Sequence, residues 1–543
     1  MRPRSTSPRL LVAGLTVGAL LLAACGDDGD AGDTTSAGGS ADGATTAGSG
    51  TTAAPTDVDP DGVLKIGFNL AAAGGVFFDP RDQQTPGMPI HYNIYGTLLR
   101  QQQDGTYEPG LAREATIVDP QTIEVVLQEG VTFQDGTPLD AEDVKATIER
   151  NLGDAKAVSR MSELTALAGP GGSVEVTSPT TLTLHLSTPT AGSFYNLLAH
   201  NETMPLPKEG LDSGHDFNAD PIGAGPFKLV SQDAQRIVLE KWDGYFRADD
   251  IQLAGVEWVH VDPASLVPAM RSGAIDVAVT TIDQNQQLAG SGLEVRSEPS
   301  PDKVSWMAMM CERQPAFGDI RVRQALNHAT DKEAVLQAIY AGQGTVMTQF
   351  WTPAGGEFYL PEIEGSYPYD VEKAKQLLAE AGYSDLRLII PSTGGQQQRL
   401  AELLQAQWAE AGIEVEIFPS TNVIQDVYID KKTDFFQQGG NRFWTDKITR
   451  VFMPGSIGTT CDPKDPVFTK MVNDLRALDR TDPRAVSLWH DISRYLNDNA
   501  FGVWLVNPND TSAYNGDVLG NPTWTPEQVG NYYPDVHEVY VKA

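Results

Sequence analysis

Most residue patterns that would mark catalytic chemistry are missing from this chain. Its eight histidines stand singly, and none begins a zinc-binding His-Glu-x-x-His motif. No Gly-Lys dipeptide occurs, which excludes a Walker A loop, and no serine lies in a Gly-x-Ser-x-Gly elbow. The 72 acidic residues could still hide a pair of catalytic carboxylates. The chain therefore favours binding over catalysis, and we expect no metal and no other cofactor.

Cys25 has a chemical role that its surroundings indicate. It ends the run Leu22-Ala23-Ala24-Cys25, which follows three arginines and an uncharged apolar stretch over residues 10–22. This is the order of an export signal, and a cysteine at its end is similar to the bacterial lipobox, whose thiol takes a diacylglyceryl group. We expect residues 1–24 to be a lipoprotein signal peptide, with the mature protein extracytoplasmic and anchored to the cell membrane by lipidated Cys25. A plain secretory signal that happens to contain Cys25 is the alternative.

The other two cysteines are Cys311 and Cys461. In a compartment that tolerates disulfides they have one possible pairing, so we expect them to be bonded. Two separate buried thiols are the alternative. Neither cysteine has the spacing of a metal ligand.

Composition separates a tether from a folded body. Residues 25–60 are mostly Gly, Ala, Ser, Thr and Asp, which bury too little surface to fold, so we expect a disordered tether there. The remainder is long enough for two or three domains. The formal net charge of the full chain is −33, and such a surface repels phosphate backbones, so we expect no nucleic-acid partner.

Periodicity predicts a mixed α/β body. In the first half we expect a strand over 63–70, a hairpin of 122–127 with 131–133, and a helix opened by Asp140. An alternating strand over 182–186, a hairpin of 227–230 with 236–242, and a strand–helix–strand unit over 256–279 should follow.

The second half carries clearer helix signals. Thr330-Asp331-Lys332-Glu333 has the pattern of a capping box, and Asp370 and Gly382 should begin and end a further helix. Residues 386–390, 396–411 and 413–418 alternate as strand, helix and strand, the pattern of a βαβ unit in a largely parallel sheet.

Several spaced motifs follow one another along the body. They are residues 78–80 (FDP), 94–99 (IYGTLL), 107–112 (YEPGLA), 122–128, 133–144 (FQDGTPLDAEDV), 221–227 (PIGAGPF), 320–327 (IRVRQALN) and 369–382 (YDVEKAKQLLAEAG). In this order they resemble family 5 of the extracellular solute-binding proteins, the dipeptide, oligopeptide and nickel-type receptors of ABC importers. The lipobox agrees with that resemblance.

The resemblance also implies an architecture that the spacing of residues in the sequence could not show. It implies a two-lobed, periplasmic-binding-protein-like α/β fold (class II, cluster C type) with a subdomain inserted in lobe I, closing over its ligand. The expected parts are lobe I at 61–93, 220–309 and 505–543, the inserted subdomain at 94–219, and lobe II at 310–504, with crossings near 306–311 and 502–506.

The same resemblance implies ligand contacts in lobe II. Asp446 matches a family aspartate that pairs a peptide's α-amino group, although Lys447-Ile448-Thr449 departs from the family's continuation. Packing and loop-capping roles are the alternatives for Trp444 and Asp446, and solvation is the alternative for Arg442. For Trp351 and Trp504 the alternative is a position in the core. The full set of expected ligand-binding residues is Phe77, Trp351, Arg442, Phe443, Trp444, Asp446 and Trp504.

We therefore expect a non-enzymatic, monomeric receptor that binds a small peptide or peptide-like solute between two closing lobes. Its partners would be that solute and the membrane permease subunits of an ABC importer. The alternative is a tethered extracellular hydrolase.

Overall fold

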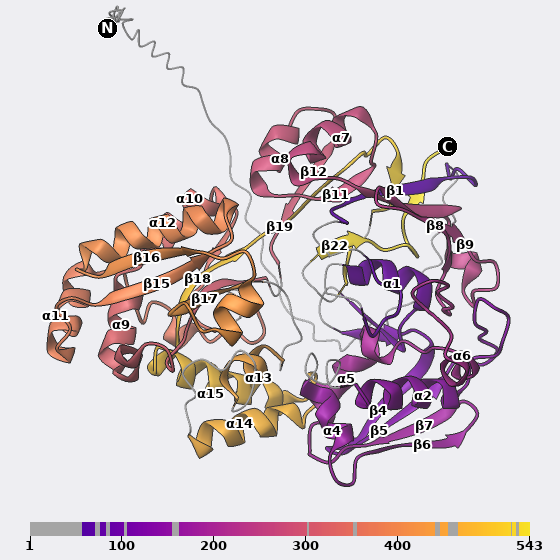
Figure 1. Ribbon diagram of the computed structural model, residues 1–543, viewed down its shortest axis with the longest axis horizontal. Helices are drawn as coiled ribbons and strands as arrows, with labels where there is room; N and C mark the ends of the chain where they lie inside the picture. The colour runs from indigo at the N-terminus through magenta and orange to yellow at the C-terminus, as the bar shows by residue number, and fades with distance from the viewer. Residues whose placement is uncertain are drawn as a thin grey trace, which may run out of the picture. The chain divides into compact units, whose positions relative to one another are not determined.

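The computed structural model of the protein describes residues 57–70, 76–82, 87–102, 106–154, 162–300, 303–350, 356–439, 446–453, 465–522, 524–527 and 531–543. Three larger sheets organise these residues: one of seven strands, one of four strands, and a further four-stranded sheet that is inserted in the first part of the chain (Figure 1). The predicted tether and signal peptide lie outside the described residues.

The first sheet has seven strands and is built around β1 (Val63–Phe68). β1 runs parallel to its neighbours β10 (Gly255–His260) and β11 (Val277–Val279), and the other pairs are antiparallel. Leu64 and Ile66 are at most 1% exposed, as expected for a central strand. The strand order is β12-β19-β11-β1-β10-β9-β8, with β8 at Phe227–Gln232, β9 at Arg236–Lys241, β12 at Glu294–Glu298 and β19 at Asp510–Tyr514.

Short helices and C-terminal strand pairs accompany this sheet. α7 (Leu266–Ser272) connects β10 to β11, which confirms the predicted strand–helix–strand unit. The remaining elements are α1 (Met88–Tyr95), η5 (Ala248–Asp250), η6 (Pro263–Ser265), α8 (Ile282–Leu288), and the pairs β20 (Leu519–Gly520) with β23 (Tyr540–Val541) and β21 (Trp524–Glu527) with β22 (Asn531–Pro534).

The inserted region folds around a four-stranded antiparallel sheet of order β4-β5-β7-β6. Leu182 and Leu184 of β7 (Thr181–His185) are fully buried between half-exposed neighbours, so the predicted alternation is confirmed. α2 (Ala141–Leu152) begins at the N-cap Asp140, as predicted, and Asp140 and Asp143 form a capping box there. The other elements are β2 (Leu99–Gln101), β3 (Tyr107–Pro109), β4 (Ala112–Asp119), β5 (Thr122–Leu127), η2 (Ser162–Leu164), α4 (Thr165–Ala168), β6 (Ser173–Ser178), α5 (Ala191–Tyr195), η3 (Asn196–Ala199), η4 (Asn201–Thr203) and α6 (Lys208–Ser213).

The second lobe is a four-stranded sheet, β14-β18-β13-β17, beside a parallel pair of β15 (Arg387–Ser392) and β16 (Glu414–Pro419). α12 (Gly395–Glu410) joins that pair, so the predicted βαβ unit is confirmed. The other elements are β13 (Ser305–Met309), η7 (Pro315–Gly318), α9 (Ile320–His328), α10 (Lys332–Tyr340), β14 (Gly344–Val346), η8 (Pro361–Ile363), α11 (Val371–Ala381), η9 (Ile424–Ile429), β17 (Phe435–Gly439), α13 (Asp446–Phe452), α14 (Pro466–Arg476), α15 (Pro483–Asp498) and β18 (Gly502–Pro508).

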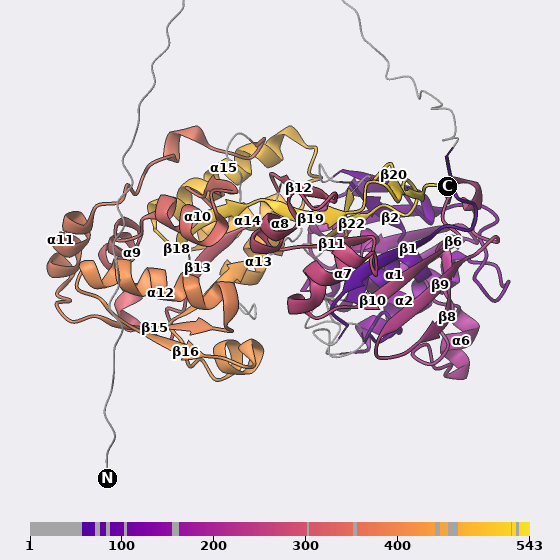
Figure 2. The same cartoon turned by 90° about the horizontal axis from the view of Figure 1, so that it is seen from above.

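The chain passes twice between the two sheets. It leaves the first sheet after β12 and enters the second at β13, and it returns where β18 is followed by Asn509 and β19 (Figure 2). β13 and β18 pair with each other inside the second sheet. The crossings therefore lie at 299–304 and at Asn509, a few residues from those expected, and the division into lobes and inserted subdomain stays a prediction at its boundaries.

Two local expectations were wrong. β5 pairs with β4 and β7 rather than with residues 131–133, where Thr132 forms only an isolated bridge with Pro138. Asp331, not Thr330, is the N-cap of α10, because its carboxylate accepts the Ala334 N–H. The Thr330 hydroxyl instead donates to the Leu326 carbonyl at the end of α9.

The capping box of α2 predicts how much stability each of its two aspartates contributes. Asp140→Ala should lower the free energy of unfolding by about 1 kcal/mol, as N-cap losses do. Asp143→Ala should cost more, because its carboxylate accepts the N–H groups of both Asp140 (2.8 Å) and Lys208 (2.7 Å). Urea unfolding would measure both, with exposed Glu142→Ala as the control. A loss for Asp143→Ala no larger than for the control would contradict this reading.

Candidate functional site

Most of the predicted lobe II contacts cannot be placed. Trp351, Arg442, Phe443 and Trp444 lie outside the described residues, and Asp446 is the first residue of α13. Cys25 and Cys461 also lie outside them. Cys311 is disulfide-bonded in the structure, while its pairing with Cys461 stays a prediction.

Trp504 lies in the interior of the second lobe. It has no exposed surface, and its ring centroid is 4.9 Å from that of Trp306 and 5.6 Å from that of Phe350. The neighbouring Gly502 is needed for this packing, since a Cβ there would lie 2.7 Å from the Trp306 ring. Trp504 thus packs the core in this structure, and a ligand contact by it stays a prediction.

Phe77 is the predicted residue that the structure places at the surface. Its side chain is 42% exposed, which is unusual for a phenylalanine. Its backbone is nevertheless fixed. Nε2 of buried His91 is 2.6 Å from the Phe77 carbonyl, and the Tyr95 hydroxyl donates to the Phe78 carbonyl at 2.7 Å. Burial lowers the pKa of His91 to about 4, so this imidazole is neutral and Nε2 carries the donated hydrogen.

The residues after Phe77 are fixed by side chains from distant segments. Arg150 of α2 pairs with the Asp79 carboxylate through both terminal nitrogens, one of them 3.0 Å from Oδ1. The Asp79 N–H donates to Asn218 Oδ1 at 3.0 Å, and Asn201 donates to the Pro80 carbonyl at 2.7 Å. The loop over 77–80 is therefore held by α1, α2 and the segment 201–218, and it presents one aromatic ring to solvent.

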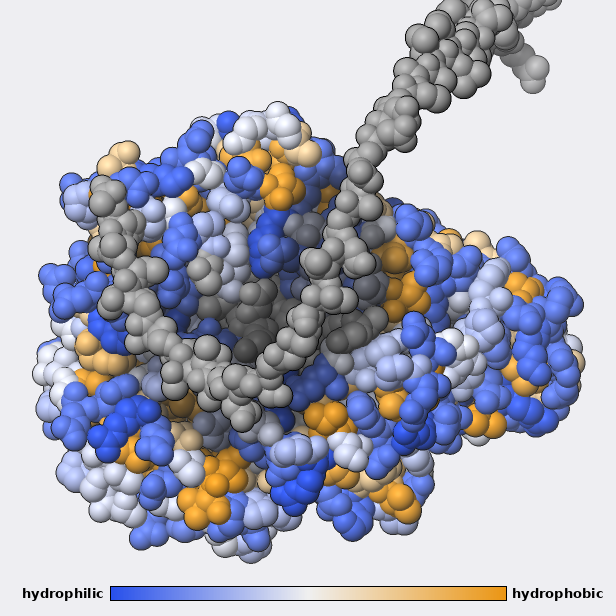
Figure 3. Space-filling view, turned by 180° about the vertical axis from the view of Figure 1, so that it is seen from behind, coloured by the Kyte–Doolittle hydropathy of each residue, from blue (hydrophilic) through white to orange (hydrophobic). Residues whose placement is uncertain are grey.

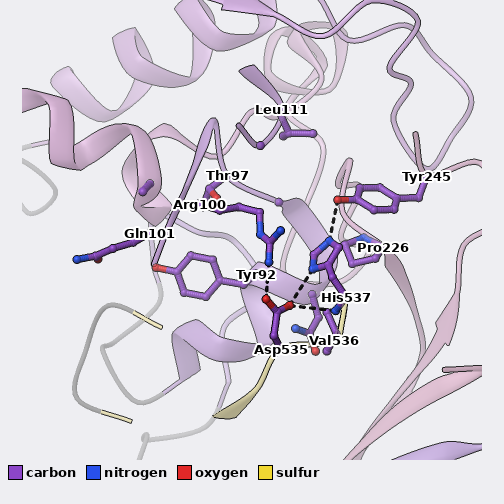
Figure 4. Close-up of a pocket in the computed structure, with 14 residues that line it drawn as sticks. Tyr92, Thr97, Arg100, Gln101, Leu111, Pro226, Tyr245, Asp535, Val536 and His537 are labelled. Atoms are coloured by element: carbon purple, nitrogen blue, oxygen red, sulfur yellow. Dashed lines mark hydrogen bonds and ion pairs between the residues drawn. The ribbon is translucent and has the colours of Figure 1, made fainter. Parts of the chain in front are cut away.

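A pocket with a buried ion pair lies within the first part of the fold (Figure 4). It encloses about 70 Å³ and is lined by fourteen residues from α1, β2 and the segments around Leu111, Pro226, Tyr245 and 535–537. At its centre Arg100 of β2 donates to Asp535 Oδ2 at 2.5 Å. Asp535 Oδ1 accepts from both the backbone N–H and Nδ1 of His537, each at 3.0 Å, and the Tyr245 hydroxyl is 3.0 Å from His537 Nε2.

Burial and pairing fix the charges of this pocket. Burial alone would raise the pKa of Asp535, but the His537 hydrogen bond and the Arg100 charge outweigh it and lower the pKa to about 2. Burial lowers the pKa of His537, which is therefore neutral, and the Tyr245 O–H donates to its Nε2. Burial raises the pKa of Tyr245 to about 12. The pocket thus holds one fixed ion pair and a neutral imidazole.

This arrangement suits hydrogen bonding better than covalent chemistry. The His537 nitrogens are both engaged, and the lining contains neither serine nor cysteine. Sequence reasoning missed Arg100, Asp535, His537 and Tyr245, because Arg100 and Asp535 are 435 positions apart and no local pattern joins them. Across the described ranges, no group of three or more His, Cys, Asp or Glu side chains could hold a metal ion.

Two further properties of the described residues concern the polarity of the surface and the length of the helices. Polar residues cover most of the face seen in Figure 3, with apolar residues scattered among them, in line with the high net charge. No helix in the described part of the chain has the length and apolar composition to cross a membrane.

The chain matches one protein-family model, described as bacterial extracellular solute-binding proteins, family 5, over residues 106–455. Among curated proteins, it is 28% identical to a glutathione-binding protein, GsiB, of Salmonella paratyphi A. That alignment spans 367 residues, 66% of this chain and 69% of the relative.

Solved structures share the fold at lower identity. The binding protein DppA of Helicobacter pylori, in complex with the peptide STSA, aligns with a TM-score of 0.74 and 21% identity, covering 90% of this chain and 99% of that one. AgaA of A. tumefaciens R10, in complex with agropinic acid, aligns with a TM-score of 0.73 and 23% identity, covering 85% and 95%.

The Asp535 network should make stability depend on pH in a defined direction. A carboxylate whose pKa falls from 3.8 unfolded to about 2 folded stabilises the fold above pH 4, and this contribution is lost as the pH falls toward 2. Asp535→Asn should therefore lower the unfolding free energy at pH 7 by about 2 kcal/mol or more, and by less at pH 3. Urea unfolding at both pH values, with exposed Asp517→Asn as control, would test this. An Asp535→Asn deficit that does not shrink in acid would contradict it.

Proposed function

Because the chain belongs to family 5 of the bacterial extracellular solute-binding proteins, we propose that it captures a peptide or peptide-like solute and delivers it to an ABC importer. Members of this family are solute-binding receptors rather than enzymes, and the alternative of a tethered hydrolase has no support. The similar proteins named above bind glutathione, the peptide STSA and agropinic acid. The proposed ligand class is therefore a small peptide or a peptide-like solute.

The observation that carries the proposal is the double crossing between two sheets. The segments at 299–304 and Asn509 are the places where the backbone joins β12 to β13 and β18 to β19. A two-lobed protein connected in this way binds by closure, since contacts from both lobes form together only in the closed state. Phe77 in the first lobe, with Arg442, Phe443, Trp444 and Asp446 in the second, are the proposed contacts, and Trp351 and Trp504 are secondary ones.

The proposed contacts differ in the energy that they would supply. Phe77 offers an aromatic surface on a fixed loop, so binding would not have to order its backbone. Asp446 would pair a positively charged amino group, where a desolvated charge pair left without one partner costs about 2–5 kcal/mol. The aspartate would therefore dominate affinity, and the phenylalanine would select for apolar side chains of the ligand.

The first experiment identifies the ligand. Mass spectrometry of small molecules that co-purify with the protein, followed by calorimetry with those molecules and with a panel of di- to pentapeptides, would test the receptor role directly. Saturable binding without turnover is expected. Hydrolysis of the bound molecules would contradict the proposal.

Two substitutions should weaken binding without unfolding the protein. Asp446→Asn should raise the dissociation constant for a peptide about tenfold or more, at about 1.4 kcal/mol per decade, and Phe77→Ala should raise it less. The unliganded melting midpoint should stay near that of wild type while the ligand-induced upward shift shrinks. Exposed Val230→Ala, on β8, is the control for Phe77→Ala. A lower unliganded midpoint with an intact ligand shift would assign Asp446 to structure.

We further propose that the receptor acts from a lipid anchor at Cys25, reaching its permease through the tether 25–60, and that it acts as a monomer. Cys25→Ser should abolish lipidation and release the protein into the medium, as fractionation and intact-mass measurement would show. A serine variant that stays in the membrane with residues 1–24 uncleaved would indicate a spanning anchor instead.

A further inference from the structure

Lys332 is a buried cation with almost no polar contact. It is the first residue of α10, and only 9% of its surface is exposed. Its ammonium makes one long hydrogen bond, 3.5 Å from Nζ to the Met347 carbonyl, and no carboxylate pairs with it in the described part of the chain. An ammonium has three donors and strongly favours hydration, so a single weak contact leaves most of its burial cost uncompensated.

Among the described residues, no charged group of the adjoining segments pairs with Lys332. The Asp331 carboxylate accepts the Ala334 N–H at 2.9 Å, and Glu333 is exposed. On the packed helix α12, Gln407 bonds to the Asp331 backbone, and Glu410 accepts from the Tyr369 hydroxyl at 3.4 Å. Burial is the cause of the lowered pKa of Lys332, about 8, and no neighbouring charge offsets it. Near pH 7 the side chain is therefore still mostly protonated.

A cavity of about 190 Å³ adjoins Lys332. It lies entirely in the second lobe, between the start of α10, the residues around β14 and the segment 365–369. Its lining includes Val346, Pro368, Tyr367 and Tyr369. Three of its hydroxyls are already bonded within the protein: Thr330 to Leu326, Ser366 to Ile363 and Tyr367 to Asn497. The cavity thus combines partly apolar walls with one buried lysine whose ammonium pairs with no carboxylate of the described residues, although the acids Asp331 and Glu333 also line it.

We propose that this cavity binds a small organic carboxylate, whose charge compensates the Lys332 ammonium. A carboxylate supplies acceptors for several N–H donors at once and a single negative charge, which matches one ammonium. Phosphate fits less well, because Asp331 and Glu333 also line the cavity and would repel a second charge. The apolar walls favour an acid with a short hydrocarbon chain. The site does not depend on lobe closure or on the proposed peptide ligand.

Binding of butyrate provides the test, because pairing would raise the pKa of the lysine. At pH 8.5 wild type should bind butyrate saturably and take up protons, which calorimetry in two buffers of different ionisation enthalpy detects. Neutral butyramide should not bind. Lys332→Arg keeps the charge at this pH and should bind butyrate without proton uptake, whereas Lys332→Met should lose at least tenfold in affinity. Peptide binding by Lys332→Met should match that of wild type.

The variants also report on the cost of the buried charge. Since the pKa of Lys332 lies below that of an unfolded lysine, the charged form destabilises the fold at neutral pH, and this penalty fades as the pH rises from about 8 to 10.5. Lys332→Met should therefore melt above wild type at pH 7, with a gap that narrows at alkaline pH. No saturable butyrate binding by wild type, equal binding by Lys332→Met, or phosphate binding as tight as that of butyrate would each overturn the proposal. If Lys332→Arg fails to fold, the comparison of butyrate affinity between wild type and Lys332→Met tests the proposal.

Discussion

The chain crosses from the first sheet to the second at 299–304 and returns at Asn509, and the strands on the second-lobe side of these crossings pair with each other. β13 and β18 run antiparallel from Ser305↔Val506 to Ala308↔Gly502. Side chains tie the crossings together as well: Lys303 Nζ donates to the Asn509 carbonyl at 3.3 Å and lies 3.6 Å from an Asp510 oxygen, and Asn507 donates to the Lys303 carbonyl. Any motion between the lobes must therefore turn about two neighbouring connections, one between β12 and β13 and one at Asn509, which these hydrogen bonds link to each other. This constraint limits the relative motion to rotation at two neighbouring points of the backbone.

Buried charged side chains differ between the two parts of this fold in whether a group of opposite charge pairs with them. In the first part of the chain, two buried acids are paired with cationic or imidazole side chains: Asp79 with Arg150, and Asp535 with Arg100 and His537. These pairs join segments that are far apart in sequence, and removing one partner would leave a buried charge uncompensated. In the second lobe Lys332 has no such partner. The contrast singles out Lys332, because proteins rarely bury an ammonium without an acceptor of opposite charge.

What the sequence could reveal was local. Both ends of α11 follow from Asp370 and Gly382, and the structure bears out both. The hairpin assigned to 122–133 failed because β5 finds its partners at β4 and at β7, some 60 residues further on. Trp504 shows a second limit, since a tryptophan that packs a core and one that binds a ligand look alike in sequence. The Arg100–Asp535 pair and the burial of Lys332 arise from tertiary contacts alone. No pattern of residue spacing in the sequence could therefore have predicted them.

The position of β19 in the first sheet affects how the protein is made. β19 lies between β12 and β11, yet its residues, 510–514, come more than 200 positions after those strands and near the end of the chain. Because the polypeptide is synthesised from its N-terminus, the whole second lobe must be made before the gap beside β11 can be filled. Until then β11 and β12 expose unpaired edges, which are prone to pair with other chains. The sheet that begins with β1 is therefore completed last, and a chain that ends before Asp510 would keep both edges open.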